Sequence, residues 1–433
     1  ESTDTLKVQP NAHLDIVGDL FMGSDASQAI TVDQSAGFSV RSIHGNVNFD
    51  ISGTASLGGD ADLGIFDADG DAGLKKGNTL SSYIGKTSVQ EGGILRAFQA
   101  WSLSKYSSHS VDGELIIGDK GLREDQQIAD LTGSGSVSVQ NQSHLYYGDN
   151  NQDFEFSGTT SGNGSLVKEG TGIATISGTL GHTGFTKVHA GKLLLASGGV
   201  LSQSSTALIS SSDNSPILDL GGTSQDVALV KLHGGTFRNG SLTADNVVTA
   251  ERRDNKIDGV TSDDASVKAT YSSEFNDDVS LTFIGSSEFK DLAINRATVT
   301  ISPGSSLSLS EGINGSSSVL NADSEDLSLQ DQLIVDGALT VGSGIELGAG
   351  NDLLQIGESG SIRSTEATES DPLVIDGGSG NTDVLLDLSG NYYSLSKGPD
   401  GFFVADNGTG TKELIGNFEV VGVKNQGVAY FGE

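Results

Sequence analysis

The sequence has no cysteine and very little proline, methionine or tryptophan, with 5 Pro, 1 Met and 1 Trp in 433 residues. A disulfide framework is therefore excluded. No apolar run reaches the ~20 residues of a transmembrane helix, and Glu1–Gln9 lacks the pattern of a signal peptide. We therefore expect a soluble, processed segment. Two explanations of the missing cysteine stay open: passage through a narrow pore as an unfolded chain, or a long repetitive core that needs no cross-link.

Basic residues are also scarce, because 24 Lys and Arg face 57 Asp and Glu, for a formal net charge of −33. This charge disfavours nucleic acid and anionic membrane as partners, and we expect no membrane insertion by this chain. Between Lys168 and Lys268, however, nine basic residues meet ten acidic ones. Candidate self-association or ligand-binding residues in this near-neutral middle are Lys187, Lys192, Lys231, Arg238, Arg252, Arg253 and Lys256. They form either a row along the molecule or a patch compensated by Asp245, Asp254 and Asp258.

Glycine, by contrast, is abundant, with 60 residues. Between Ser161 and Ser197, glycines separate short segments in which apolar and small polar residues alternate. The segments are Ser165–Val167, Ile173–Ser177, Phe185–Val188 and Lys192–Ala196. Such alternation predicts strands with one buried face, and the connections are too short for a helix. The pattern predicts an all-β fold, a right-handed parallel β-helix that forms a three-sided solenoid with a few loop insertions.

A recurring glycine indicates the length of one coil. The anchors Gly92, Gly113 and Gly135 are 21 and 22 residues apart, and Gly337 and Gly360 are 23 apart. We expect these glycines to occupy equivalent corners of successive coils.

Three stretches interrupt the repeat. Arg96–Tyr106 contains the single tryptophan and fits either a strand-loop excursion or a short helix. Tyr146–Phe156 is a polar loop between aromatic residues, and Thr365–Pro372 is an acidic loop that ends in proline. Insertions on a solenoid usually decorate one face.

The central stretch also resembles the β-strand repeat of autotransporter passenger domains, surface proteins of Gram-negative bacteria. That repeat reads glycine-small-leucine-x-lysine-x-glycine, then a Thr/Leu/Ser strand, then threonine-glycine-x-threonine and valine-x-alanine-glycine-x-leucine. The matching residues are Gly164, Leu166, Lys168, Gly170, Ile176, Ser177, Gly178, Thr183, Gly184, Thr186, Val188, Ala190, Gly191 and Leu193. Phe185 and Lys187 depart from the pattern. The resemblance implies one β-helical passenger domain over residues 1–433, without the translocating barrel of such proteins.

Motifs for catalysis or metal binding are weak. Asp67–Gly73 alternates carboxylates as a calcium loop does, but it lacks the closing glutamate. Gly348–Leu353 and Gly378–Val384 resemble the turns of calcium β-rolls, yet each is isolated. We expect plain turns at all three, no metal and no cofactor. No Gly-Asp-Ser-Gly supplies a serine nucleophile, and no catalytic residue is predicted. Three histidines without metal-ligand spacing are expected at the surface: His182, His189 and His233.

The resemblance and the composition together predict a bacterial adhesin, exported through the outer membrane and displayed on the cell surface. Its expected partners are copies of itself on neighbouring cells, in low-affinity, multivalent contacts that cause aggregation or biofilm formation. Host matrix protein or glycan is a further expected partner. The alternative is a β-helix polysaccharide lyase or hydrolase that acts on acidic glycans, with its acids lining a groove across several coils.

Overall fold

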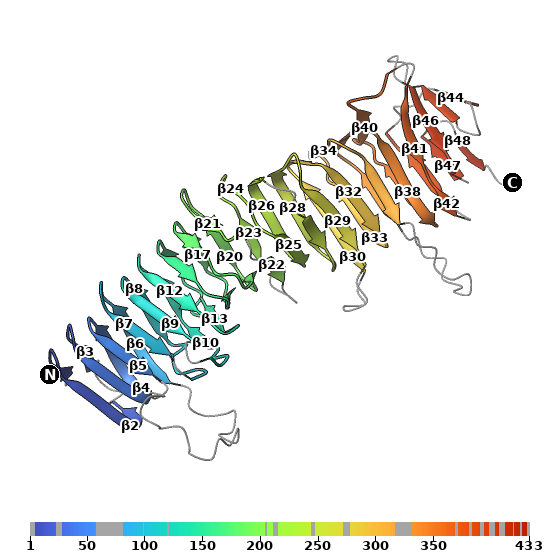
Figure 1. Cartoon of the computed structure of the whole chain (residues 1–433). Helices are drawn as coiled ribbons and strands as arrows, with labels where there is room; N and C mark the ends of the chain where they lie inside the picture. Colours follow the sequence, from blue (N-terminus) through green and yellow to red (C-terminus); the bar gives the residue numbers. More distant parts are fainter. Residues whose placement is uncertain are drawn as a thin grey trace. The chain divides into compact units, whose positions relative to one another are not determined.

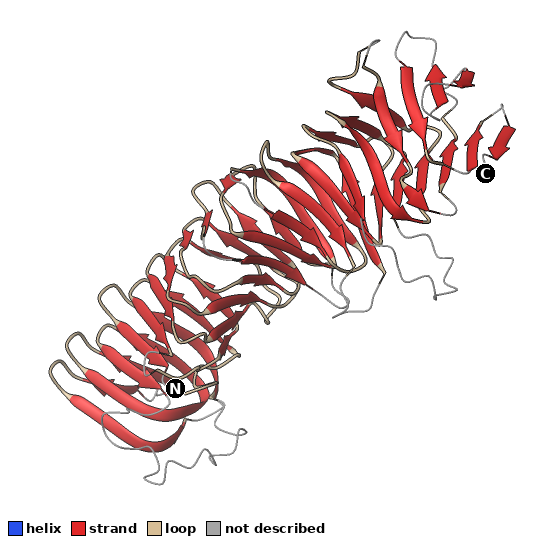
Figure 2. Cartoon of the chain, turned by 45° about the vertical axis from the view of Figure 1, so that its right-hand side comes forward, coloured by secondary structure: helices blue, strands red, loops and turns tan. Residues whose placement is uncertain are grey.

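The computed structural model describes residues 5–22, 28–57, 81–97, 99–118, 121–203, 206–210, 215–243, 247–271, 278–316, 331–368, 371–380, 383–389, 394–397, 403–406, 412–418, 420–424 and 427–430. Within these ranges the chain is all β, as Figure 2 shows. A search of the same residues finds no helix of the length and apolar character needed to cross a membrane.

The chain forms two compact units, Glu1–Thr223 (unit 1) and Ser224–Glu433 (unit 2). The strands of unit 1 are β1 (Thr5–Val8), β2 (His13–Phe21), β3 (Gln28–Val32), β4 (Gly37–Ile51), β5 (Thr54–Leu57), β6 (Ser82–Val89), β7 (Ile94–Ala97), β8 (Ser107–Val111), β9 (Glu114–Ile117), β10 (Gln126–Ile128), β11 (Asp130–Thr132), β12 (Ser136–Val139), β13 (His144–Tyr147), β14 (Phe154–Phe156), β15 (Thr159–Ser161), β16 (Ser165–Lys168), β17 (Ile173–Ile176), β18 (Thr179–Leu180), β19 (Thr186–Val188), β20 (Lys192–Leu195), β21 (Val200–Leu201), β22 (Thr206–Ser210) and β23 (Ile217–Asp219).

The strands of unit 2 are β24 (Ser224–Gln225), β25 (Leu229–His233), β26 (Gly235–Leu242), β27 (Val247–Ala250), β28 (Asn255–Thr261), β29 (Ser266–Thr270), β30 (Val279–Ile284), β31 (Ser286–Phe289), β32 (Asp291–Asn295), β33 (Ala297–Ile301), β34 (Ser306–Leu309), β35 (Ile313–Ser316), β36 (Gln332–Val335), β37 (Ala338–Val341), β38 (Gly344–Gly350), β39 (Leu353–Ile356), β40 (Ser361–Ser364), β41 (Leu373–Asp376), β42 (Ser379–Gly380), β43 (Val384–Asp387), β44 (Ser394–Lys397), β45 (Phe403–Asp406), β46 (Lys412–Gly416), β47 (Val420–Val423) and β48 (Gly427–Tyr430).

One coil of unit 1 consists of β16, β17 and β18, each on a different sheet. β16 pairs in parallel with β13 of the previous coil and β19 of the next. β17 likewise lies between β14 and β20, and β18 lies between β15 and β21. Figure 1 shows the strands of this part of unit 1, coloured from cyan to green, stacked in chain order. The predicted parallel β-helix with three sides is confirmed.

The strands predicted in the central stretch are confirmed as β16, β17, β19 and β20, and each differs from its predicted bounds by one residue at one end. The prediction missed β18, which has only two residues. A two-residue strand contains no apolar alternation, so its position is decided only by its neighbours β15 and β21.

The core of unit 1 consists of side chains that stack from coil to coil. Leu145 pairs in register with Leu166, and Ala174 with Leu193. All four are at most 1% exposed. Successive side chains of a strand point to opposite faces, so a strand of four residues places two side chains in the core. Each fully buried leucine contributes about 1.5–3 kcal/mol.

A column of stacked glycines lies at one corner of unit 1. A Cβ atom on any of them would lie 1.9–2.3 Å from a backbone oxygen of the preceding coil. The column consists of Gly93, Gly113, Gly135, Gly158 and Gly178. Gly93 therefore occupies the corner for which Gly92 was predicted. Gly92 has a φ of 80° and open space around its Cβ position, which makes it a turn residue.

Unit 2 also has three-stranded coils, such as β32–β34 and β35–β37, but there the second and third strands of a coil belong to one sheet. The predicted corner glycines are equivalent here, since Ser361 N–H donates to the carbonyl of Gly337 at 2.9 Å and Gly360 directly precedes Ser361. Parallel pairing gives way to antiparallel pairing in the last strands. β44, β45 and β46 form antiparallel neighbours, and β47 pairs antiparallel with β48.

The three interruptions contain no helix in their described residues. Arg96–Tyr106 is the end of β7 followed by turns, with position 98 outside the described residues. Tyr146–Phe156 is the end of β13, a polar turn and β14. In Thr365–Pro372, the N–H of Thr368 donates to the carbonyl of Asp371 at 2.7 Å, and residues 369–370 lie outside the described residues.

Candidate binding site

The seven basic residues predicted to contact a partner lie on different sheets and in both units. In unit 1, Lys187 belongs to β19 and Lys192 to β20. The five in unit 2 are Lys231 in β25, Arg238 in β26, Lys256 in β28, and Arg252 and Arg253 between β27 and β28. Within each unit they are divided between two sheets or their connecting turn, rather than aligned on one strand position.

Two of these lysines have acidic partners. Lys192 Nζ lies 3.5 Å from a carboxylate oxygen of Asp219, and Lys231 Nζ lies 3.7 Å from one of Glu251. Their charges are compensated within the chain, although by residues other than the three aspartates considered from the sequence. The role of the seven residues in binding stays a prediction.

A group of aromatic and polar side chains lies on the outer face of the sheet formed by β10, β13, β16 and β19. The strand register places Asp125, His144, Ser165 and Phe185 in one row, and Gln127, Tyr146, Val167 and Lys187 in the next. Four successive coils therefore contribute to one surface. We call Trp101, His144, Tyr146 and Phe185 the aromatic cluster.

The rings of the aromatic cluster contact one another in a chain. Phe185 lies 5.1 Å from His144 between ring centroids, and His144 lies 5.9 Å from Tyr146 at an interplanar angle of 77°. Trp101 stacks on Tyr146 at 5.8 Å and 30°. All four side chains are partly exposed. The cluster thus presents ring surface to solvent beside the polar side chains of Asp125, Gln127 and Lys187 and the buried Val167.

Trp101 has a φ of 61°, in the left-handed region. A bulky residue rarely adopts this conformation, and it persists where the surroundings impose it. Here the N–H of Trp101 donates to the carbonyl of Asp125 at 2.8 Å. The buried amide of Gln126 also holds this turn, because it accepts from Leu103 N–H at 2.9 Å and donates to the carbonyl of Gln99 at 2.6 Å. The next coil therefore fixes the position of the tryptophan.

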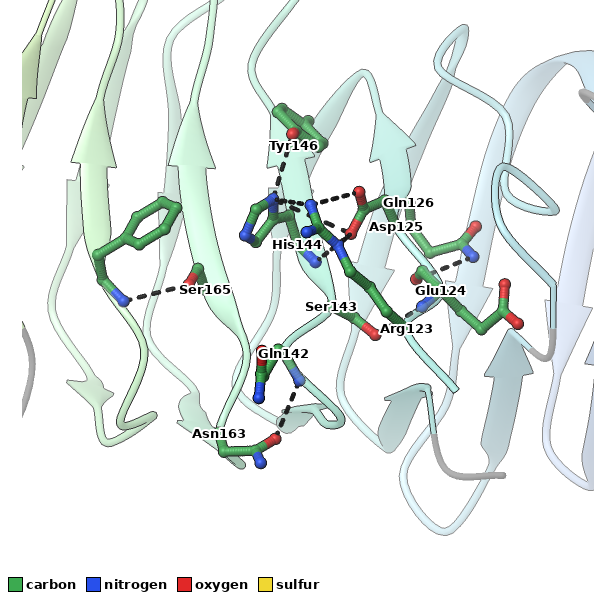
Figure 3. A network of polar contacts seen from close by, with 11 residues as sticks. Arg123, Glu124, Asp125, Gln126, Gln142, Ser143, His144, Tyr146, Asn163 and Ser165 are labelled. Atoms are coloured by element: carbon green, nitrogen blue, oxygen red, sulfur yellow. Dashed lines mark hydrogen bonds and ion pairs between the residues drawn. The ribbon is translucent and has the colours of Figure 1, made fainter. Parts of the chain in front are cut away.

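A hydrogen-bond network joins the cluster to a fixed ion pair (Figure 3). The carboxylate of Asp125 accepts from Arg123 Nε at 3.0 Å, from Arg123 Nη2 at 2.9 Å and from the N–H of His144 at 2.8 Å. Arg123 Nη2 also donates to Nδ1 of His144 at 3.0 Å, and the hydroxyl of Tyr146 lies 3.2 Å from the same nitrogen. The arginine is thereby held in one orientation.

Burial lowers the pKa of His144, and the nearby charges of Arg123 and Lys187 lower it further, against the opposing effect of Asp125. The ring is therefore neutral at pH 7. Because Nδ1 accepts from its neighbours, the single ring proton is assigned to Nε2. Burial, aided by Asp125, raises the pKa of Tyr146, so its phenol stays protonated.

The sequence offered three separate signals for this surface without connecting them. Trp101 and Tyr146 lie in two of the stretches that interrupt the repeat, and Phe185 and Lys187 are the two departures from the repeat pattern. Only the register between coils shows that these residues meet. His144 and Arg123 carried no signal at all.

The candidate calcium motifs do not form a metal centre in the described part of the chain. Among the described residues, no group of three or more His, Asp or Glu side chains is placed to bind a metal ion. Asp67–Gly73 and part of Gly378–Val384 lie outside them. Gly348–Leu353 comprises the last three residues of β38, a two-residue connection and the first residue of β39, and the connection contains the fully buried Asp352.

One expectation about the histidines was wrong. His182 is 0% exposed, and its two ring nitrogens lie 2.8 and 3.1 Å from the hydroxyls of Thr160 and Thr186. Burial lowers the pKa of this ring to about 4, so it is neutral at pH 7. His189 and His233 are partly exposed and lie 2.6 and 3.2 Å from Glu169 and Glu251.

Comparison with protein-family models, with curated proteins and with solved structures finds no match for this chain. The resemblance to autotransporter passenger domains therefore rests on the repeat residues alone.

Proposed function

We propose that this chain is an adhesin displayed on a bacterial cell surface, and that it binds glycans at the aromatic cluster. One observation carries the proposal: partly exposed rings from successive coils share one sheet face with a fixed arginine and a neutral histidine. The flat face of an aromatic ring suits the C–H face of a sugar, and the polar groups suit its hydroxyls. Trp, Tyr and Arg are also the residues most enriched among binding hot spots.

Surface display makes weak sites effective. A site of this kind binds each saccharide weakly, but many copies on one cell act together through multivalency. Export through the outer membrane and contacts between copies on neighbouring cells belong to the same proposal. The autotransporter-like repeat in the central stretch supports them.

The binding experiment compares matched ring variants. Trp101→Ala and Phe185→Ser remove cluster rings, whereas Phe21→Ser removes an equally aromatic side chain that is 73% exposed and stacks on His44 at 4.7 Å. Retention of the whole chain on a panel of immobilised polysaccharides is measured. Each cluster variant should lose about tenfold in affinity, equivalent to ~1.4 kcal/mol, and Phe21→Ser should bind as the wild type does.

Unchanged binding in both cluster variants, or an equal loss in Phe21→Ser, would refute a glycan site at the cluster. Circular dichroism and melting of each variant confirm that the fold is intact.

The alternative, a polysaccharide lyase or hydrolase, has one observation in its favour. Burial raises the pKa of Glu124, beside the cluster, to about 6. A carboxyl group with such a pKa can act as a general acid near neutral pH. Its neighbour Asp125 accepts three hydrogen bonds from within the chain, however, and forms an ion pair with Arg123, so it is poorly placed to serve as the second group. Release of reducing sugar or unsaturated product from acidic polysaccharide, abolished in Glu124→Gln, would establish this alternative.

A further inference from the structure

Three hydrogen-bond donors of this surface remain available to a ligand. Arg123 uses Nε and Nη2 on Asp125 and His144, which leaves Nη1 without an acceptor among the described residues. His144 Nε2 and Lys187 Nζ likewise have no acceptor in the described part of the chain. The carboxylate of Asp125 already accepts three hydrogen bonds from within the chain. A ligand that supplies acceptor oxygens matches these three donors.

We propose that the aromatic cluster binds an acidic saccharide, a sugar that carries a carboxylate. Arg123 and His144 bind one carboxylate, Lys187 binds the carboxylate of a neighbouring acidic sugar, and a sugar ring between them lies against Phe185 and Tyr146. This inference rests on the proposed function and names the class of glycan.

The arginine is preorganised for this role. Asp125 holds its guanidinium through two parallel hydrogen bonds, the geometry in which Arg and carboxylate recognise each other most strongly. The direction of Nη1 is fixed by the same contacts, so a ligand does not have to order the side chain. Binding to preorganised groups avoids part of the entropy cost of association.

Lys187 bounds the other side of the surface. It shares a row with Tyr146 across Val167, and the strand spacing of ~4.8 Å places the two backbone positions about 10 Å apart. In the proposed complex a saccharide lies between Lys187 and Arg123, with its ring over the aromatic side chains. Lys187 differs in this respect from Lys192 and Lys231, whose charges are compensated by Asp219 and Glu251.

The net charge of the chain does not prevent such binding. A formal charge of −33 repels a polyanion at long range, but charges farther away than ~8 Å are largely screened at physiological salt. The hydrogen-bond donors at the site then determine whether an acidic ligand binds. An acidic ligand should bind at this site and poorly elsewhere on so acidic a chain.

The test uses two probes that differ only in charge, immobilised polygalacturonate and its fully methyl-esterified form. The whole chain should bind the acid form about tenfold more tightly. Lys187→Gln should lower that preference about fivefold, as expected for the loss of one exposed ionic contact. The matched control is Lys192→Gln on the adjoining side of the same coil, which should keep the preference.

Equal affinity for the two forms would refute the proposal that the ligand is an acidic saccharide. A preference for the acid form that Lys187→Gln leaves unchanged would refute it as well. If Phe185→Ser still lowers the affinity for the esterified form about tenfold, the proposed glycan site stands, while the proposal of an acidic saccharide fails. If the ring variants change neither affinity, the proposed function itself fails.

Discussion

Lys168 is a buried residue with an ionisable end. It is 0% exposed, and its ammonium donates to the carbonyls of Glu169, of Gly170 at 2.9 Å and of Ala190 at 3.4 Å. Burial lowers its pKa to about 8, opposed by Glu169 and Asp153. This is the lysine of the repeat motif. The repeat motif has a lysine at this position because its ammonium donates hydrogen bonds to backbone carbonyls in the turns of two coils, and not because it supplies surface charge.

The pKa of Lys168 predicts a specific pH dependence of stability. Between pH 8 and pH 10.5 the unfolded chain retains the lysine proton that the folded chain has lost, so folding becomes more favourable as pH rises. Relative to Lys168→Met, the wild type should gain about 2 kcal/mol between pH 7 and pH 10. Denaturant unfolding at a series of pH values measures the difference.

The control for this experiment is Leu166→Met, which changes a buried side chain of the same strand and keeps the lysine. It should follow the pH dependence of the wild type. A constant difference between wild type and Lys168→Met over this range would show that the ammonium is solvated as in the unfolded chain.

At the level of elements, three aspartates stack where successive coils of unit 2 enter β36, β39 and β43. Asp331, Asp352 and Asp383 are each 0% exposed. The N–H of Asp331 donates to Oδ1 of Asp352 at 3.0 Å, and the N–H of Asp352 donates to Oδ1 of Asp383 at 2.9 Å. Each carboxylate therefore fixes the corner of the coil before it.

The stacked aspartates make the stability of unit 2 dependent on pH. Burial raises the pKa of Asp352 to about 7, and the charges of Asp331 and Asp383 raise it further, against the hydrogen bond from Asp331. Between pH 3.8 and pH 7 the folded chain holds a proton that the unfolded chain has lost, so stability falls as pH rises.

Asp352→Asn should remove the loss of stability that comes from ionising the buried carboxyl group, while it keeps the acceptor for the N–H of Asp331. At pH 8 the variant should be more stable than the wild type by on the order of 2 kcal/mol, and at pH 4 the gain should vanish. Melting at the two pH values measures both. The exposed Asp371→Asn serves as control, and a gain of equal size at both pH values would contradict the assignment to titration.

Sequence reasoning predicted most strands because alternation within a strand is a local property. It could not choose between Gly92 and Gly93, since only the approach of the neighbouring coil distinguishes a stacked glycine from a turn glycine. It placed His182 outside because its partners, Thr160 and Thr186, become neighbours only through folding. The aromatic cluster was missed for the same reason, because it depends on the register between coils.

At the scale of the whole molecule, the acidic charge bears on self-association. Two chains with a formal charge of −33 each repel, so contacts between copies require local attraction within ~8 Å at physiological salt. If copies on neighbouring cells associate through the basic residues of the middle segment, aggregation should weaken as salt rises. It should also fall when all seven are replaced by Ser, with surface expression confirmed by antibody; settling at an unchanged rate would exclude this segment as the contact.

Adhesion through the aromatic cluster is tested most directly on cells. Non-aggregating bacteria that display the whole chain are passed over a polygalacturonate-coated surface, and attached cells are counted for wild type, for Trp101→Ala with Phe185→Ser, and for Phe21→Ser. At equal surface expression, wild type and Phe21→Ser should attach alike, and the cluster variant should attach no better than cells without the protein. Attachment of the cluster variant at the level of the wild type would contradict the proposal that this surface is adhesive.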